Sequence, residues 1–249
     1  MPKKLGLPID ALYGRAVLAG FYIALAGAVS TILGVGFPPN VSRLISACVF
    51  PIGLIFVVLT NSELFTGDIL TTGSRKPANS FLFAVYIFNW FGTILAAQVF
   101  YWAGLYKSFN NQLGINMINL IQNKMTMPWY HLFYSGILCN ILVCLSILLS
   151  QKTDDDFKKI IFIFIPIFTF VACGFEHIVA DMYYFTAALH CLKDKSIVEA
   201  SGLTADDVNS FMTVPNVLKY FIWISAGNIV GGLLDIIFIE LSRVRKTDS

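Results

Sequence analysis

Long apolar runs separated by short polar segments make up the pattern along this chain. A helix that crosses a bilayer needs about 20 mostly apolar residues, and six of the runs are long enough. They lie at about 16–36, 44–73, 80–106, 129–150, 160–190 and 216–241. Because these runs take up most of the 249 residues, the pattern predicts a single all-α integral membrane domain over residues 1–249 and leaves no room for a separate soluble domain.

The polar segments between the runs predict turns and loops. "KTDDDFKK" (152–159) is a short charged turn, whereas 107–128 and 191–215 are longer connections. Within the last of these, "TADD" (204–207) has the spacing of a helix-capping signal and predicts a short surface helix. The first residues, "MPKKLGLPIDALYGRA", are polar and basic and lead directly into the first run, so we expect no cleaved signal peptide.

Two of the runs carry ionisable residues in their middle. "LIFVVLTNSELFTGDILTTG" contains Glu63 and Asp68, and "VACGFEHIVADMYYF" contains Glu176, His177 and Asp181. In each run the two carboxylates are five residues apart, and the second pair follows the first by 113 positions. Ionisable side chains are costly inside a membrane and mark functional sites by default. The alternative is that Glu63 and Glu176 are buried structural groups bonded to their neighbours.

Other residues repeat in the same order along the chain. Gly20 in the first run corresponds to Gly136 in the fourth, and "NWFG" (89–92) in the third corresponds to "NIVG" (228–231) in the sixth. These pairs predict two copies of a three-helix unit. Copies with three spans each have opposite orientations in the membrane, which makes an inverted repeat. We expect repeat one at about 16–106 and repeat two at about 129–241.

In transporters built on this plan, interrupted helices in corresponding positions line the substrate path near the membrane midplane. A break frees backbone N–H and C=O groups, which are tolerated only where protein or a wet cavity covers them. We therefore expect helices 2 and 5 to be broken, and "SELFTGD" and "GFEHIVAD" to meet at the centre of the subunit.

Composition and charge agree with a membrane protein. The chain is 57% hydrophobic and 13% charged, with a mean hydropathy of +0.72, whereas a soluble domain has about a quarter charged residues. Six spans put both chain ends on one side of the membrane, and that side then holds eleven of the seventeen Lys and Arg residues. The positive-inside rule therefore predicts cytoplasmic termini. We expect a plasma-membrane protein without a nucleic-acid partner.

The five cysteines lie mostly within the runs and form no CxxC motif. We interpret them as small apolar packing residues; a disulfide framework or a metal site is the alternative. No metal or cofactor is expected. An intramembrane enzyme that uses Glu176 and His177 is disfavoured, because adjacent helical residues point about 100° apart and no second histidine lies at metal-ligand spacing.

Bulky apolar residues flank the two expected breaks: Phe50, Leu54, Phe65 and Phe170. They are either core packing or narrow hydrophobic gates across a path. The central polar groups, His177 and Thr66, can each make one or two hydrogen bonds. Such a path suits a small solute that is neutral or becomes neutral at the gate. Histidine is suited to share a proton with a weak acid, because its charge changes near physiological pH.

Several segments resemble signature segments of the formate–nitrite transporter family. They are "ELFTGD", "GFEHIVADMYY", "GNIVGG" (227–232), "GILCNILVCL" (136–145) and "FNWFGTILAAQ" (88–98). The resemblance covers all six runs in order. It implies a homopentamer of aquaporin-like six-helix subunits, each with its own pore, that moves small monovalent weak-acid anions such as formate, acetate, lactate, nitrite or hydrosulfide. We expect a proton to move with the anion.

The resemblance also implies roles for residues along the pore. His177 is similar to the central pore histidine, Thr66 to the threonine on the facing broken segment, and Asn228 to a pore-facing asparagine. The residues that correspond to the two constrictions are Phe50, Leu54 and Phe170 on the cytoplasmic side and Phe65 on the external side.

At the vestibule, Lys124 corresponds to the lysine that attracts anions, and Glu176 and Asn140 correspond to a polar network that ties this lysine to the histidine's helix. One position departs from the family: Asp181 stands where many members carry Asn. Asp181 either pairs with Lys124 and lowers the positive potential, or is protonated or hydrogen-bonded in the manner of asparagine.

A passive channel for small neutral solutes, such as water, glycerol or ammonia, is the alternative function. A lysine in the vestibule argues against it, because a neutral solute gains nothing from a fixed positive charge.

Overall fold

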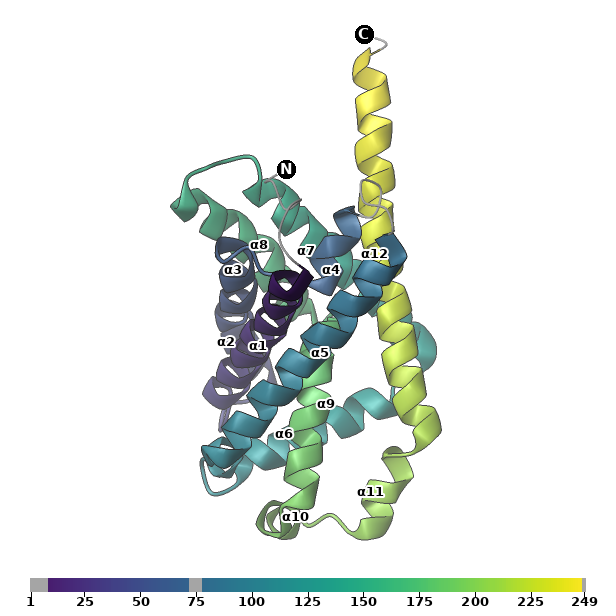
Figure 1. The fold of residues 1–249 in the computed structure, drawn as a ribbon. Coiled ribbons are helices and arrows are strands. Elements are labelled where there is room, and N and C mark those ends of the chain that lie inside the picture. The colour runs from purple at the N-terminus through teal and green to yellow at the C-terminus, as the bar shows by residue number, and fades with distance from the viewer. Residues whose placement is uncertain (1–8, 72–77, 248–249) are drawn as a thin grey trace.

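In this computed structural model the backbone is described for residues 9–71 and 78–247, and the side chains for 11–70 and 80–237. The described chain folds into a bundle of helices (Figure 1). In order they are α1 (Ile9–Leu33), α2 (Pro39–Val49), α3 (Pro51–Leu59), α4 (Phe65–Asp68), the 3₁₀ turn η1 (Ile69–Thr71), α5 (Ala78–Trp102), the 3₁₀ turn η2 (Leu105–Lys107), α6 (Gln112–Thr126), α7 (Trp129–Ser150), α8 (Asp156–Cys173), α9 (Ile178–Lys193), α10 (Lys195–Ser201), α11 (Ala205–Phe211) and α12 (Val214–Thr247).

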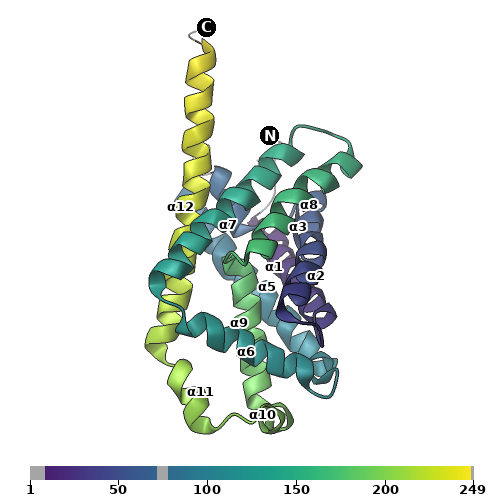
Figure 2. The ribbon, with the colours of Figure 1, turned by 180° about the vertical axis from the view of Figure 1, so that it is seen from behind.

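Figures 1 and 2 distinguish two ends of the bundle. The upper face, as drawn, carries the turn between α7 and α8 and the C-terminal end of α12, and the lower face carries α6, α10 and α11. α1 runs down toward the lower face, α2 and α3 run back up, and α8 and α9 run down. The most extensive helix–helix contacts are those of α1 with α5 and of α7 with α12.

Within the described residues, five helical stretches are long and apolar enough to cross a membrane, with α2 and α3 counted as one. The pair α8–α9 makes a sixth, bent by 54° at its break. These stretches agree with the six predicted runs, and α7 (Trp129–Ser150) has the predicted bounds. The second span starts earlier than predicted, at Pro39, where a proline suits the first turn of a helix. The predicted end of that span, at 72–73, lies outside the described residues.

The break in the second span begins at Asn61, which follows α3 with a left-handed φ of 53°. The backbone N–H of Ser62 donates to the carbonyl of Val57 at 2.9 Å, and the N–H of Asn61 donates to Val58 at 3.1 Å. Together these bonds make a Schellman motif, which satisfies the last carbonyls of a helix.

The break in the fifth span has the same construction. Gly174 follows α8 with a φ of 72°. The N–H of Phe175 donates to Phe170 and the N–H of Gly174 to Val171, both at 3.0 Å. Each of these four residues lies 113 positions after its counterpart in the second span. The offset between the two pairs of carboxylates therefore extends to the backbone bonds that end both helices.

The connections on the lower face are largely helical. The "TADD" prediction is confirmed: Thr204 caps α11, and Asp207 completes the capping box. α6 was predicted only as a connection. Its buried residues recur three or four positions apart and face the bundle, which is the pattern of an amphipathic surface helix; they include Leu113, Met117, Ile121 and Met125.

All five cysteines are free. Cys139, Cys144 and Cys191 are buried in the core, and Cys48 and Cys173 are exposed.

Glycines allow the closest helix approaches in both halves. A Cβ on Gly20 of α1 would overlap the backbone carbonyl of Asn89 on α5, and a Cβ on Gly92 would overlap the carbonyl of Val17. In the second half, a Cβ on Gly227 of α12 would overlap a carbonyl of α7. Small residues at such positions are typical of tightly packed helices in membranes.

We predict that Gly20→Ala lowers the melting temperature in detergent, because α1 and α5 must move apart. Overpacking of this kind costs about 1–3 kcal/mol. Gly14→Ala is the matched control: Gly14 lies in the same helix with no atom within 4 Å of its would-be Cβ. Equal melting temperatures for the two variants would contradict the close approach.

Candidate transport site

His177 and Thr66 meet inside the helix bundle, one from each broken span. His177 is the N-cap of α9, and Thr66 lies in the single turn of α4. The Nε2 of His177 lies 2.9 Å from the Oγ1 of Thr66, and both residues are buried. Two segments 111 positions apart in the sequence are thus joined by one side-chain hydrogen bond.

The helix cap determines which nitrogen of His177 carries the proton. The backbone N–H of Ala180 donates to Nδ1 of His177 at 3.3 Å. A nitrogen that accepts a hydrogen bond carries no proton, so the proton of a neutral imidazole lies on Nε2. Nε2–H then donates to the Thr66 oxygen, and the hydroxyl hydrogen of Thr66 is left for another acceptor.

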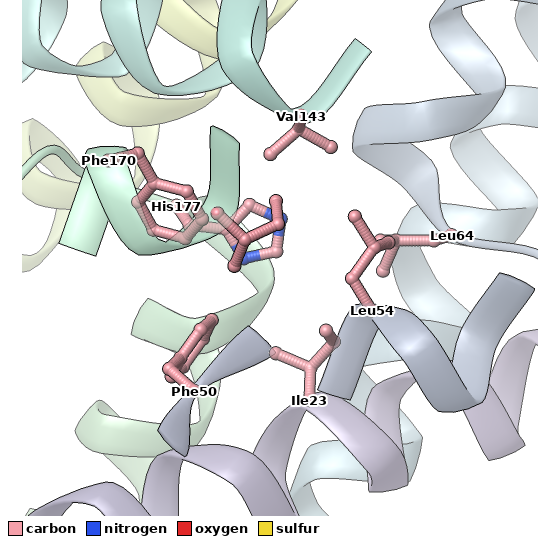
Figure 3. A pocket seen from close by; sticks show the side chains of 8 residues that line it. Ile23, Phe50, Leu54, Leu64, Val143, Phe170 and His177 are labelled. Atoms are coloured by element: carbon pink, nitrogen blue, oxygen red, sulfur yellow. The ribbon is translucent and has the colours of Figure 1, made fainter. Parts of the chain in front are cut away.

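A small cavity adjoins His177 (Figure 3). It is lined by Ile23, Phe50, Leu54, Leu64, Val143, Ile167, Phe170 and His177. Its volume is about 10 Å³, which is close to the room that one water molecule needs. In Figure 3 the apolar side chains surround the imidazole from several helices. Because His177 is the one polar residue of this lining, a solute here touches mostly hydrocarbon.

The apolar lining is arranged at more than one level. Phe50 and Phe170 pack edge to face with ring centroids 5.7 Å apart. Because α2 and α3 run upward, Phe50 lies about 6 Å, or one helical turn, below Leu54. The aromatic pair therefore lies toward the lower face. Cytoplasmic termini would place the upper face inside, so this pair would belong to the external half, whereas the resemblance implied a cytoplasmic constriction.

Phe65 does not line this cavity. Its ring packs against Tyr86 of α5, with centroids 5.0 Å apart, and it lines a groove between α5 and α12. Its neighbour Leu64, 113 positions before His177, is the residue that lines the cavity. The side chains of successive residues point in different directions, so the sequence could not tell which of the two faces the path.

Asn89 holds the break of the second span. From α5 its amide nitrogen donates to the carbonyls of Ala16 at 2.7 Å and Glu63 at 2.9 Å. Its Oδ1 accepts the backbone N–H of Phe65 at 2.8 Å. One buried side chain thus satisfies backbone groups on α1, in the break and at the start of α4.

Asn228 does the same for the fifth span. From α12 its amide nitrogen donates to Gly136 and Glu176 carbonyls, both at 2.9 Å, and its Oδ1 accepts the N–H of Ile178 at 2.9 Å. Asn228 is fully buried. The resemblance implied a pore-facing asparagine, but both amide hydrogens are engaged by the backbone, so the side chain has no donor left for a solute.

Asn140 of α7 bonds the backbone of two other elements. Its amide nitrogen donates to the carbonyl of Thr66 at 3.2 Å and to that of Asn228 at 2.7 Å. It was expected in a network with Lys124. Instead it ties α7 to α4 and α12, and among the described residues no hydrogen bond joins it to Lys124.

Lys124 lies in a buried cluster with two carboxylates. Its Nζ donates to Asp181 at 2.8 Å and to Glu176 in a shorter contact. The side chains of Lys124, Glu176 and Asp181 are 12%, 4% and 1% exposed, so little water shields the cluster. Asp181 was expected either to pair with Lys124 or to be protonated or hydrogen-bonded like an asparagine. The geometry favours the pair. One ammonium therefore faces two carboxyl groups.

Lys124 remains a cation in this setting. Burial alone would lower the pKa of Lys124, but the carboxylates of Asp181 and Glu176 outweigh burial and raise that pKa. Oδ2 of Asp181 has no hydrogen-bond partner among the described residues. The positive charge of Lys124 is thus compensated within the cluster.

Comparison with known proteins decides the family. The sequence profile of the formate/nitrite transporter family matches residues 1–241. The chain belongs to this family. Its members are channels and transporters, so the protein is an integral membrane transporter or channel and not an enzyme.

Relatives of the family cover almost all of this chain. It is 31% identical over 233 residues to the formate channel FocA of Haemophilus influenzae, covering 88% of this chain and 81% of FocA. It is 33% identical over 259 residues to the uncharacterized transporter YrhG of Bacillus subtilis, covering 99% and 90%. A pentameric formate channel with formate bound matches in structure with a TM-score of 0.88 and 26% identity, over 98% of this chain and 100% of that one.

Sequence reasoning missed part of the site. It did not include Leu64, Ile23, Val143 or Ile167, which line the cavity. The 113-residue offset carried a signal for Leu64, since Leu64 lies 113 positions before His177. The sequence did not indicate that the apolar residues on α1, α7 and α8 line the cavity, because the same residue types occur in the core and along the path.

We predict that Lys124 and Asp181 are energetically coupled. Lys124→Ala leaves buried carboxylates without their cation, which costs about 3–5 kcal/mol for a buried pair. The loss of melting temperature should be larger with Asp181 intact than in the Asp181→Asn background. A double-mutant cycle on thermal unfolding measures the coupling.

Lys219→Ala is the control for this cycle. Lys219 is also a part-buried lysine, but it donates to the carbonyl of Met125 and not to Asp181. Its effect should add to that of Asp181→Asn. Additive behaviour of Lys124→Ala as well would contradict the coupling.

Proposed function

We propose that the protein is a homopentameric transporter that moves small weak-acid anions together with a proton, through one pore in each subunit. The name of the FocA relative and the pentameric channel with formate bound support formate as the first candidate solute. We further propose two inverted repeats, with the upper face in the cytoplasm of a plasma-membrane protein. The matching helix breaks support the repeats, and the distribution of Lys and Arg supports the orientation.

The observation that carries the proposal is the dry cavity beside His177. It has room for about one water, and one polar side chain lies among eight lining residues. An ion cannot keep its hydration shell in such a place, and an unpaired charge there is very costly. A monovalent weak acid avoids this cost because it can cross the constriction as the neutral acid.

The proposed steps follow the fall in polarity along the path. The N-terminal end of α9, with its positive dipole, points toward the centre and favours an approaching anion. As water is lost, the pKa of the anion rises, because burial disfavours its charged form. The anion takes a proton from the aqueous side, either directly or relayed through His177, which regains its own proton from that side. The neutral acid then passes the apolar constriction and releases the proton on the far side.

A passive channel for small neutral solutes is the second candidate, favoured by the same apolar lining. Uptake of labelled formate and of glycerol by proteoliposomes separates the two. Formate uptake that grows with an inward proton gradient supports the proposal, whereas glycerol uptake without formate uptake would overturn it. A competition panel of acids from formate to lactate across pH then identifies the preferred solute.

We predict that His177→Phe abolishes proton-coupled formate uptake, because phenylalanine can neither exchange a proton nor bond Thr66. His177→Asn is the matched variant: asparagine can still cap α9 and donate to Thr66, but it does not titrate. Initial uptake rates in proteoliposomes are the measurement. Undiminished uptake by correctly assembled His177→Phe would remove His177 from the mechanism, and uptake retained by His177→Asn alone would assign the proton to water.

We predict that Leu54→Ala or Phe170→Ala raises the ratio of lactate to formate uptake, because each enlarges the cavity. Phe164→Ala is the control, since Phe164 stacks on Phe168 of the same helix and does not line the cavity. An unchanged ratio in both cavity variants would show that these side chains do not set the size limit.

A further inference from the structure

Arg43 lies on the same stripe of the second span as the constriction. Arg43, Ala47, Phe50 and Leu54 are spaced by four, three and four residues, which places them on one side of a helical stretch. Phe50 and Leu54 line the cavity. Ala47 is buried and Arg43 is exposed. At seven residues before Phe50, Arg43 lies about 10 Å further toward the lower face.

The guanidinium of Arg43 lies against the break of the fifth span. A Cβ on Gly174 would be 3.4 Å from both Cζ and Nη1 of Arg43 and 3.6 Å from Nη2. Gly174 is exposed and has a φ of 72°. It follows Phe170 by four residues at the lower end of α8. Arg43 and Gly174 therefore lie together just below the pair of aromatic rings.

The charge of Arg43 is not compensated by its neighbours. Among the side chains that the structure describes, no carboxylate lies within ion-pair distance of Arg43, and its guanidinium donates no hydrogen bond. The corresponding break in the second span differs: there Arg15 donates to the carbonyl of Asn61, at 3.4 Å. The N–H donors of the Arg43 guanidinium therefore remain available to a solute.

Three other cations of the lower face are already engaged. Lys124 is bound by two carboxylates, Lys107 pairs with Asp194 at 3.0 Å, and Lys219 donates to a backbone carbonyl. Lys124 would be the natural attractor of anions, but its cluster has no net positive charge. Arg43 differs from these three lysines, because it is exposed, lies against the break of the fifth span and has no carboxylate beside it among the described side chains.

We propose that Arg43 forms an anion-recruiting site at the lower mouth of the path, where its guanidinium binds the carboxylate of the solute before the solute is dehydrated. The planar guanidinium matches a carboxylate in a two-pronged geometry. The site rests on the proposed function, because it needs an anionic solute that continues past Phe50 and Phe170.

The test is tracer formate uptake by proteoliposomes at about 10 mM and about 1 M ionic strength, where the screening length is about 30 Å and about 3 Å. Arg43→Gln should raise the KM about three- to tenfold at low salt and leave kcat unchanged, because only the encounter is affected. Arg43→Lys should retain most of the wild-type KM, and Arg43→Glu should raise it further. At high salt the wild type and Arg43→Gln should converge.

Lys195→Gln is the matched control. It removes one positive charge from the same face, at the start of α10, outside the Arg43–Gly174 contact. An unchanged KM in Arg43→Gln at low salt would overturn the proposal, and so would an equal effect of Lys195→Gln, which would indicate surface charge in general. Wild-type protein without formate uptake would overturn the proposed function itself, so the two failures are distinguishable.

Discussion

The structure depends on how the backbone is satisfied where two helices stop inside the membrane. Free N–H and C=O groups have no water to bond there, so each must find a partner in the protein. Asn89 and Asn228 supply such partners, with three hydrogen bonds each: one to a neighbouring helix, one within the break and one at the start of the helix that follows it. A short polar side chain with two donors and one acceptor is well suited to this task. The breaks can therefore be buried without water, and this makes a dry centre possible.

A dry centre in turn limits the chemistry of the site. The asparagines use their own polar groups on the backbone, so the cavity is left with His177 and, beside it, the Thr66 hydroxyl. His177 is itself bound twice, because its Nδ1 caps α9 and its Nε2 meets Thr66. A histidine held in this way is neutral at rest. It cannot act as a fixed cation that traps an anion, and this agrees with a solute that passes the constriction without charge.

The sequence predicted the plan of the fold better than the details of the site. Apolar runs define spans, and the paired carboxylates 113 residues apart predicted both breaks, because neither pattern depends on side-chain direction. The choice between Leu64 and Phe65 does depend on direction, and the geometry of the break sets it. Asn228 was expected to face the pore, but its side chain bonds the backbone. The sequence could not distinguish the two, because an asparagine can bond either a solute or a backbone. α6 was missed because its stripe is amphipathic and not apolar throughout.

Asp181 changes the charge of the buried cluster around Lys124. With Asp181 beside Glu176, the buried cluster holds one ammonium and two carboxyl groups, and its charge can be at most zero when one carboxyl is protonated. An anion gains little from approaching such a cluster. Positive charge is least costly where water still hydrates it, which is at the exposed position of Arg43. Attraction at the wet mouth and neutrality in the dry centre are then supplied by different residues, so each can be changed without disturbing the other.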